Sequence, residues 1–479
     1  MDVSANTSTG GSVSGLPRRR RKASKAGPGL CVVRAAALAV LLLSPSGCGP
    51  NVAQASRDLA KKITLAGTRP APPPETGEPA PRRVYLDASL SMRGFAAFEE
   101  GTTFGTLVEG LGDDLPGCQL YKYGQRGRGP APDGAALIQA ARFGRELRRP
   151  QFYDLDYNPD DRLLTQLAEE ESPAFSVLIT DGVYSVPDGA TSPPIVEAVN
   201  KWFDRGYAFG IFVFKSPFRG TIYAENRPVG VPNVSVGERP FYAFVLSPSE
   251  RELNAFWQKL HQRMPQARAI LFSDSSVVTK VDFSERTKGT YSFQRPPGAP
   301  YHWHMLDADA FGDGGRAAVD YVVSYIVAPD YPVSEFRFDL AATYYRWDGN
   351  RFVEVKGGPA AGFDHKFGEV TMQDASAAEP ATRPGAEGQR TAKPKPNLKI
   401  VYPKDPEGAY GFYHLRLVGS PKSLRTDIRD LSTRDDTDPR NAGSTFRFYE
   451  LVNAITEIHF GRLRAAKNSP ALFVTIANR

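Results

Sequence analysis

Two short apolar runs of this chain each end in side chains that carry oxygen ligands. The first run is followed by Asp87, Ser89 and Ser91 at alternate positions, and the second by Thr180 and Asp181. Carboxylate and hydroxyl oxygens suit a hard divalent cation such as Mg²⁺, and Mn²⁺ or Ca²⁺ accept the same kinds of ligand. The sequence therefore predicts a metal site formed by Asp87, Ser89, Ser91 and Asp181. The alternative is a serine-rich turn and an Asp-Gly turn that bind nothing.

These residues meet only if both runs are neighbouring strands of one sheet. Parallel strands bring their carboxyl ends to one crevice, which is where open α/β sheets hold ligands. Between about 83 and 275 strand-like and helix-like patterns alternate, which is typical of a mainly parallel sheet with helices on both faces. Strands are expected at 84–87, 119–123, 175–180, 207–214, 241–246 and 268–273, and helices at 103–111, 134–142, 159–170, 193–204 and 249–263. The Gly/Pro/Asn-rich stretch 217–240 is expected to form a loop or a hairpin.

The arrangement resembles the von Willebrand factor type A (VWA) family and its metal-ion-dependent adhesion site. The first motif of that family, Asp-x-Ser-x-Ser after the first strand, is matched at 87–91, and the Met-x-Gly at 92–94 also fits. The late motif, an aspartate before glycine at the end of an apolar strand, is matched by Asp181. The resemblance implies a VWA-like, Rossmann-type α/β fold over 83–275.

One part of the family pattern is missing. Members usually supply a threonine from the loop before the helix that leads into the late strand, and here the loop 154–161 contains none. Asn158 stands at a helix N-cap position and would be able to offer its amide oxygen to a metal. Asp160 or Asp161 would be able to do the same, or to favour the helix N-terminus electrostatically. Thr165 is expected inside the helix, facing elsewhere.

By the logic of the family, the metal site serves interaction or adhesion. The cation keeps an open position, and a carboxylate of a partner protein would complete its shell, so that binding depends on divalent metal. We expect no enzyme, because the chain has no Gly-x-Ser-x-Gly motif, no phosphate-binding loop and no dinucleotide fingerprint. Two alternatives stay open: a metal-dependent hydrolase of phosphate or sulfate esters, and a VWA scaffold that has lost its metal.

The N-terminal segment carries the net charge of the chain and is typical of an export signal. Residues 1–47 hold seven basic residues and one acid, which equals the net charge of +6 of the whole chain and leaves the rest close to neutral. Composition therefore argues against nucleic-acid binding. An apolar run at 35–43 follows the basic stretch; it is too short to span a membrane and suits a signal peptide.

Two processing sites compete after this signal peptide. Small residues ending in Gly47-Cys48 resemble a bacterial lipoprotein cleavage site, which predicts a lipid on Cys48 and a membrane-anchored protein of the cell envelope or periplasm. A cut after Ala55, in an Ala-x-Ala pattern, would instead release a soluble secreted protein. We expect a Pro-rich tether over 48–82, with a short helix at about 56–66 within it. Because Cys118 would then be the remaining free thiol, no disulfide framework is expected.

The pattern changes near residue 276. We expect a connector over 276–319 and then a small antiparallel, β-sandwich-like domain over 320–479, because short runs with period-two alternation follow one another there. An insert at 373–397 lacks apolar periodicity and is predicted to be disordered. A helix near 445–459 has apolar residues at helical spacing, which most simply indicates a core face.

Overall fold

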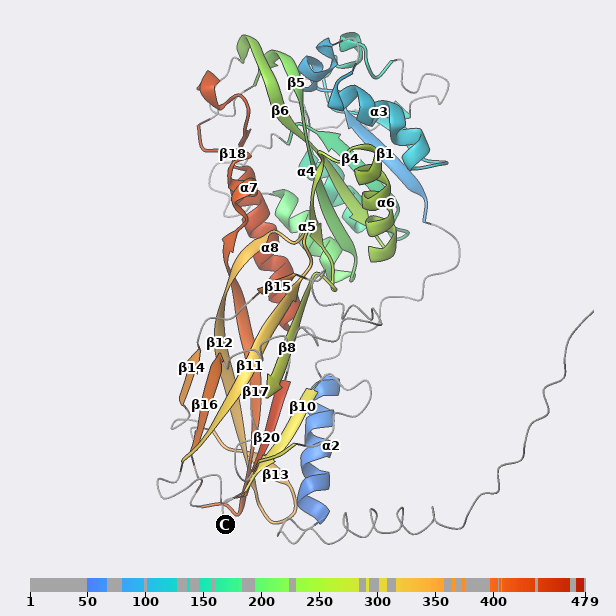
Figure 1. Ribbon diagram of the computed structural model, residues 1–479. Helices are drawn as coiled ribbons and strands as arrows, with labels where there is room; N and C mark the ends of the chain where they lie inside the picture. Colours follow the sequence, from blue (N-terminus) through green and yellow to red (C-terminus); the bar gives the residue numbers. More distant parts are fainter. Residues whose placement is uncertain are drawn as a thin grey trace, which may run out of the picture. The chain divides into compact units, whose positions relative to one another are not determined.

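The computed structural model in Figure 1 describes residues 50–66, 80–98, 101–126, 136–137, 146–156, 158, 160–182, 194–223, 230–283, 290–292, 301–307, 316–356, 364–367, 372–374, 397–403, 405, 407–435, 438–465 and 471–477. Contacts divide the chain into Met1–Pro50 and one compact unit, Asn51–Arg479. The predicted signal segment 1–47 and Cys48 lie outside the described residues.

A seven-stranded mixed sheet carries the two motifs, with its strands in the order β3-β2-β1-β4-β6-β5-β7. The strands are β1 (Arg82–Asp87), β2 (Gln119–Tyr123), β3 (Ala136–Leu137), β4 (Phe175–Thr180), β5 (Ala208–Ile222), β6 (Val231–Ser247) and β7 (Arg268–Phe272). Strand β1 is parallel to β2 and to β4. The other pairs, β2/β3, β4/β6, β5/β6 and β5/β7, are antiparallel.

The prediction of a mainly parallel sheet was therefore wrong, and the reason is the hairpin formed by β5 and β6. These strands run into the stretch expected to be a loop or a hairpin, and they pair from Ala208↔Ser247 to Ile222↔Val231. Because a hairpin reverses the chain, β6 lies antiparallel between β4 and β5. The helix expected at 134–142 is also not formed at 136–137, which is strand β3.

Alternate side chains of the strands face two separate cores, as the period of a strand requires. Val84 and Leu86 face the core that η1, α3 and α6 cover. Tyr85 and Leu178 face the opposite core, which α4 and α5 cover. These helices are η1 (Met92–Ala97), α3 (Thr103–Asp114), α4 (Asp160–Glu169), α5 (Pro194–Asp204) and α6 (Glu250–Arg263). The region is thus a mixed α/β sheet with helices on both faces.

Two further sheets follow in the chain. One has the strand order β13-β12-β17-β20-β10-β9, and the other has the order β14-β16-β11-β15, with β8 also paired to β11. The strands are β8 (Val277–Phe283), β9 (Thr290–Ser292), β10 (Tyr301–Leu306), β11 (Arg316–Val327), β12 (Val333–Trp347), β13 (Phe352–Glu354), β14 (Asp364–Phe367), β15 (Met372–Asp374), β16 (Leu398–Pro403), β17 (Tyr410–Leu424) and β20 (Ala471–Ala477). Tyr321 of β11 meets His304 of β10 across the two sheets (2.9 Å between the hydroxyl and Nε2).

These sheets differ from the expected small antiparallel domain in two respects. The segment 276–319, predicted to be a connector, contributes β8, β9, β10 and the beginning of β11. The pairs β10/β20 and β11/β15 are parallel. Parallel pairing requires a crossover that returns the chain to the same end of the sheet, and a long connection separates the strands of each pair. Of the predicted disordered insert 373–397, residues 375–396 lie outside the described residues.

Helix α2 (Pro50–Ala66) belongs to the packed structure, although the sequence placed it in a tether. Ser56 and Ala60 are fully buried, and Ala60 packs with Trp303 and Phe473 of the six-stranded sheet. The hydroxyl of Thr475 donates a hydrogen bond to Ser56 Oγ (3.0 Å). Among the described helices, none is long and apolar enough to cross a membrane.

The C-terminal part of the chain returns to the seven-stranded sheet. Helix α8 (Phe448–Ala465) lies beside α5, as Figure 1 shows, and its buried residues join the same core as Tyr85. The Tyr242 hydroxyl donates to Thr445 Oγ1 (2.9 Å), and Arg462 donates to Asn200 (3.2 Å). The predicted C-terminal helix is thus found, and its apolar face is core. The remaining short elements are η3 (Pro150–Phe152), α7 (Thr426–Arg429), β18 (Ser432–Thr433), η8 (Pro439–Asn441) and β19 (Thr445–Phe446).

Candidate metal centre

The register of β1 and β4 brings the two motifs together. Leu86 of β1 pairs with Ile179 of β4, so Asp87 and Thr180 follow side by side at the same edge of the sheet. Asp87 is completely buried, and the next residue after β4, Asp181, is 2% exposed. The carboxyl ends of two parallel strands thus place carboxylates of both motifs in one crevice, as the sequence predicted.

The turn after β1 places the two serines. Asp87 Oδ1 accepts a hydrogen bond from the N–H of Ser89 (2.8 Å), which closes an Asx turn and leads into η1. Ser89 Oγ and Ser91 Oγ lie 2.9 Å apart; Ser89 is buried, whereas Ser91 is half-buried. This contact is a hydrogen bond between the two hydroxyls, and its length is close to the distance of about 3.0 Å between neighbouring corners of a Mg²⁺ octahedron with Mg²⁺–oxygen distances near 2.1 Å. The hydroxyl pair therefore has the spacing that one small cation requires.

The loop before α4 closes the other side of the crevice. Leu155 pairs with the turn after β1, because its N–H donates to Ala88 O (3.1 Å) and its carbonyl accepts from the N–H of Leu90 (2.8 Å). This pairing holds Asn158 over the strand ends. The amide Nδ2 of Asn158 donates to Asp87 Oδ2 (2.6 Å) and to Thr180 Oγ1 (3.1 Å).

Of the three residues that were candidates to replace the missing threonine, two reach the site. Asn158 does so through its amide, and Asp160, the first residue of α4, is 2% exposed, with its Oδ2 3.0 Å from Thr180 Oγ1. The backbone carbonyl of Asp161 instead accepts a hydrogen bond from the hydroxyl of Thr165 (2.7 Å) inside α4. Thr165 is therefore a helix residue, as expected.

Burial and mutual repulsion raise the proton affinity of these carboxyl groups. Burial raises the pKa of Asp87 to about 7, and the charge of Asp181 adds to the effect, whereas hydrogen bonds from Ser89 and Thr180 oppose it. Burial also raises the pKa of Asp160 well above its usual value, with the charge of Asp87 as the next cause. Within the described part of the chain, no lysine or arginine forms an ion pair with Asp87 or Asp160. Asp87 and Asp160 thus form an acidic pair without an ion-pair partner among the described residues.

The hydroxyl of Thr180 shows that acceptors outnumber donors in the crevice. Asn158 Nδ2 and the N–H of Gly182 donate to Thr180 Oγ1 (3.1 and 3.3 Å), which takes both of its lone pairs. Its single proton serves either Asp87 Oδ2 or Asp160 Oδ2, each 3.0 Å away. Asp160 Oδ1 and Asn158 Oδ1 are buried and have no hydrogen-bond partner. A bound cation would satisfy this surplus of oxygen acceptors.

The donor set fits a hard cation held by both carboxylates and hydroxyls. The described residues contain no group of three or more His, Cys, Asp or Glu arranged to hold a metal. A site with Asp87 and Asp181 as carboxylates and Ser89 and Ser91 as hydroxyls is of a different composition. The four predicted ligands therefore lie at one edge of the sheet, and Cys48, the predicted lipid site, lies outside the described residues.

Sequence reasoning did not include Thr180 among the site residues. The signal was present, because a strand paired in parallel with β1 must place one residue beside Asp87, and that residue carries a hydroxyl. Asp160 was one of three alternatives, and only its burial beside Thr180 distinguishes it from Asp161.

The β5–β6 hairpin extends past the crevice and packs on η1. Thr180 and Val213 both pair with Tyr242, so the part of β5 beyond Val213 continues past the end of β4. A Cβ atom on Gly94 would lie 2.3 Å from Phe218 Cε2 of this extension. The glycine of the Met-x-Gly pattern is therefore needed for the close approach of the hairpin to the segment that carries Ser91.

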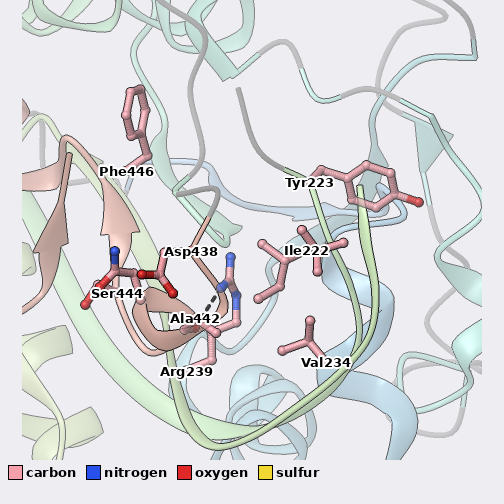
Figure 2. A pocket seen from close by; sticks show the side chains of 10 residues that line it. Ile222, Tyr223, Val234, Arg239, Asp438, Ala442, Ser444 and Phe446 are labelled. Atoms are coloured by element: carbon pink, nitrogen blue, oxygen red, sulfur yellow. Dashed lines mark hydrogen bonds between the residues drawn. The ribbon is translucent and has the colours of Figure 1, made fainter. Parts of the chain in front are cut away.

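Figure 2 shows where the hairpin meets the C-terminal segment. Arg239 Nη1 donates to the carbonyl oxygen of Ala442 (2.8 Å), and Ile222, Val234 and Phe446 line a small hollow around this contact. The hollow is about 10 Å³, which is about the room that one water molecule needs. It is a packing junction and has no space for a ligand.

The histidines whose side chains are described have partners elsewhere in the fold. His304 meets Tyr321, His414 stacks on Phe473, and His459 packs on Phe203 and Phe272. The remaining described one, His261, packs on Trp257 of α6. No interaction of these side chains with the crevice residues is found in the described part of the chain.

Comparison of this chain with family models, curated proteins and solved structures gives no significant match. The resemblance to the VWA family thus rests on the motif residues themselves.

Proposed function

We propose that this protein is an exported, lipid-anchored VWA-like protein of the cell envelope that binds a partner protein through a divalent cation. The observation that carries the proposal is the crevice at the ends of β1 and β4. It holds the buried carboxyl groups of Asp87 and Asp160 without a described ion pair, next to serine hydroxyls 2.9 Å apart. A buried carboxylate is costly unless a proton or a cation compensates its charge.

Asp87, Ser89, Ser91 and Asp181 would hold the cation, and Asp160 lies beside Thr180 where the family pattern lacks its threonine. When bound, Mg²⁺, Mn²⁺ or Ca²⁺ supplies a Lewis-acidic centre with an open position. Ser91 is the most exposed of the four predicted ligands, so a carboxylate of the partner would approach from its side. The role of this chain is to hold and orient the cation, and the partner completes the shell.

The Asn158 amide favours a second candidate, the VWA scaffold without a metal. Its Nδ2 donates to Asp87 Oδ2 (2.6 Å) and thereby places partial positive charge where a cation would otherwise act. Such a protein would bind its partner through the surface of the crevice and not through a metal. A hydrolase receives less support, since each described histidine packs against residues elsewhere in the fold.

The anchor in this proposal is a lipid on Cys48. The competing cut after Ala55 falls inside α2, whereas Gly47-Cys48 precedes the helix. Only Gly49 separates Cys48 from the first residue of α2. The lipid would therefore be joined almost directly to a folded element, and the proline-rich segment after α2 would not act as a membrane spacer.

A capture experiment with the full-length protein tests the proposal. Protein isolated from membranes is incubated with envelope extract in millimolar Mg²⁺ or in EDTA, and bound proteins are identified by mass spectrometry. We expect a partner that is retained with Mg²⁺ and lost in EDTA. Asp160→Asn should weaken this retention, whereas Asp161→Asn, the neighbouring acid on the outer side of α4, should not. A partner retained equally in EDTA would contradict metal-dependent binding and favour the metal-free scaffold.

A further inference from the structure

The side-chain amide of Asn158 is unusual, because its nitrogen is hydrogen-bonded in the crevice and its oxygen is not. Its Nδ2 donates to Asp87 Oδ2 (2.6 Å) and to Thr180 Oγ1 (3.1 Å). Its Oδ1 is buried without a hydrogen-bond partner. Buried amide oxygens normally have partners, so an unpaired one calls for a physical explanation.

The donor end of this amide faces the oxygen that the proposed cation requires. Asp87 Oδ1 accepts the N–H of Ser89 (2.8 Å) and Oδ2 accepts the Asn158 amide (2.6 Å), so Nδ2 covers a lone pair of Asp87 that a metal would otherwise bind. An amide hydrogen and a divalent cation compete for the same lone pairs and repel each other. The acceptor end, Oδ1, is by contrast a good ligand for a hard cation.

We propose that the Asn158 amide takes the place of the cation in the metal-free crevice and rotates when metal binds, so that Oδ1 replaces Nδ2 and joins the metal shell. This inference rests on the proposed function. It adds that Asn158 sets how tightly the cation binds and how fast it is released. Its amide hydrogens block the metal-free site, and its amide oxygen completes the metal shell.

The surroundings of Asn158 allow the side chain to turn without movement of the loop. The backbone nearby is fixed by the pairing of Leu155 with Ala88 and Leu90, and α4 begins at Asp160. The two ends of an amide have nearly the same size, so a half-turn about the last side-chain bond exchanges them within the same volume. The rotation breaks the hydrogen bonds of Nδ2 to Asp87 and Thr180 and changes the hydrogen bond between Asn158 and Asp160.

Two substitutions separate the blocking role from the ligand role. Asn158→Thr supplies a neutral oxygen without amide hydrogens, and Asn158→Val has the same shape as threonine without the oxygen. The full-length wild type and both variants are titrated with Mn²⁺ by calorimetry, and their metal-free melting temperatures are measured. Asn453→Thr, which changes an amide that donates to Glu457 on α8, serves as the control.

We expect Asn158→Thr to bind Mn²⁺ about tenfold more tightly than wild type and to melt at a lower temperature without metal, because the hydrogen bonds to Asp87 and Thr180 are lost. Asn158→Val should melt lower in the same way and bind Mn²⁺ more weakly than Asn158→Thr. A structure with Mn²⁺ should show Asn158 Oδ1 within about 2.2 Å of the metal. The control should match wild type in Mn²⁺ affinity.

The outcomes distinguish this inference from the function on which it rests. If wild type and both variants bind Mn²⁺ equally, the cation site stands and the role of Asn158 is overturned. If Asn158→Thr binds and wild type does not, the amide blocks the site without ever joining a metal shell, so the rotation is overturned and the wild-type protein is a metal-free scaffold. If no variant binds, both proposals fail.

Discussion

Two buried aspartates of this protein have the same burial and opposite chemistry. Asp87 in the crevice is completely covered and Asp405 in the β sheets is 2% exposed. Burial raises the pKa of Asp87 to about 7, and no cationic side chain in the described part of the chain forms an ion pair with it. Burial also acts on Asp405, but hydrogen bonds from Arg346 and Tyr344 outweigh it, so that the pKa of Asp405 lies below its usual value.

The difference shows how a structural carboxylate differs from one that awaits a ligand. Arg346 donates to both oxygens of Asp405 (2.8 and 3.2 Å), and the Tyr344 hydroxyl adds a third hydrogen bond (2.7 Å). The charge of Asp405 is compensated inside the fold. Asp87 shares its surroundings with Asp160 and Asp181, and the donors that it receives are neutral. Because no described side chain supplies a positive charge, a proton or a cation from solution would compensate it.

The largest expected effect is an opposite pH dependence of the two sites. The Asp87 carboxyl titrates near 3.8 when unfolded and at about 7 when folded, so between these values the folded protein holds a proton that the unfolded chain has released. Metal-free stability therefore falls as the pH rises through this window, by up to about 4 kcal/mol from this group. Denaturant titrations at pH 4 to 8 measure the free energy of unfolding of wild type and Asp87→Asn. As the pH rises, the stability of the variant should increase relative to that of wild type.

Asp405→Asn provides the contrast to this series. Because the pKa of Asp405 is lowered on folding, its stabilising contribution is present above the unfolded value and is lost as the pH falls through the folded one. This variant should lose stability relative to wild type at neutral pH and approach it in acid. The same trend in both variants would contradict the contrast between the two aspartates.

A second prediction concerns Arg346, the charged partner of Asp405. Arg346→Met should lower the free energy of unfolding by about 3 kcal/mol, because it leaves the buried Asp405 without its charged partner. The double variant Arg346→Met with Asp405→Asn should recover part of this loss, since no buried charge then remains. Urea denaturation curves of the single and double variants measure both effects. A single variant as stable as wild type would show that Asp405 does not depend on Arg346.

A third prediction supplies the missing cation to the crevice. Mg²⁺ or Mn²⁺ should raise the melting temperature, with a gain of about 2.7 kcal/mol when free metal is about 100 times its dissociation constant. Asp87→Asn or Asp181→Asn should abolish the gain, and Ser89→Ala should reduce it, because a neutral ligand contributes less than a charged one. Scanning calorimetry with and without metal measures these shifts. A wild-type protein without any shift would favour the metal-free scaffold.

Local patterns in the sequence predicted the elements that position the crevice. The strands expected at 84–87, 119–123 and 175–180 are β1, β2 and β4, and the helix expected at 159–170 is α4. Asp87, Ser89, Ser91 and Asp181 come to one edge, because β1 and β4 are neighbouring parallel strands. These results depend on hydrophobic periodicity and on turn residues, which are local properties of the chain.

What the sequence did not predict depends on contacts between distant segments. The direction of β6 was missed, because the stretch 217–240 was expected to be a loop or a hairpin before β6, whereas β5 and β6 pair along it as two long antiparallel strands. The docking of α2 was missed as well, because its partners Trp303 and Thr475 are far along the chain. The difference between Asp160 and Asp161 came from burial at the first turn of a helix, which no pattern of residue types shows.

The docking of α2 also has a consequence for maturation. A cut after Ala55 would make Ser56 the new N-terminus, and Ser56 is completely buried against the six-stranded sheet. The new terminus would carry an ammonium charge at the place where the Ser56 hydroxyl accepts its hydrogen bond from Thr475. Burying that charge is expensive, so the shorter chain would hold α2 weakly or release it. A chain that begins at Ser56 should therefore cover Trp303 and Phe473 less completely than a chain that contains the whole of α2.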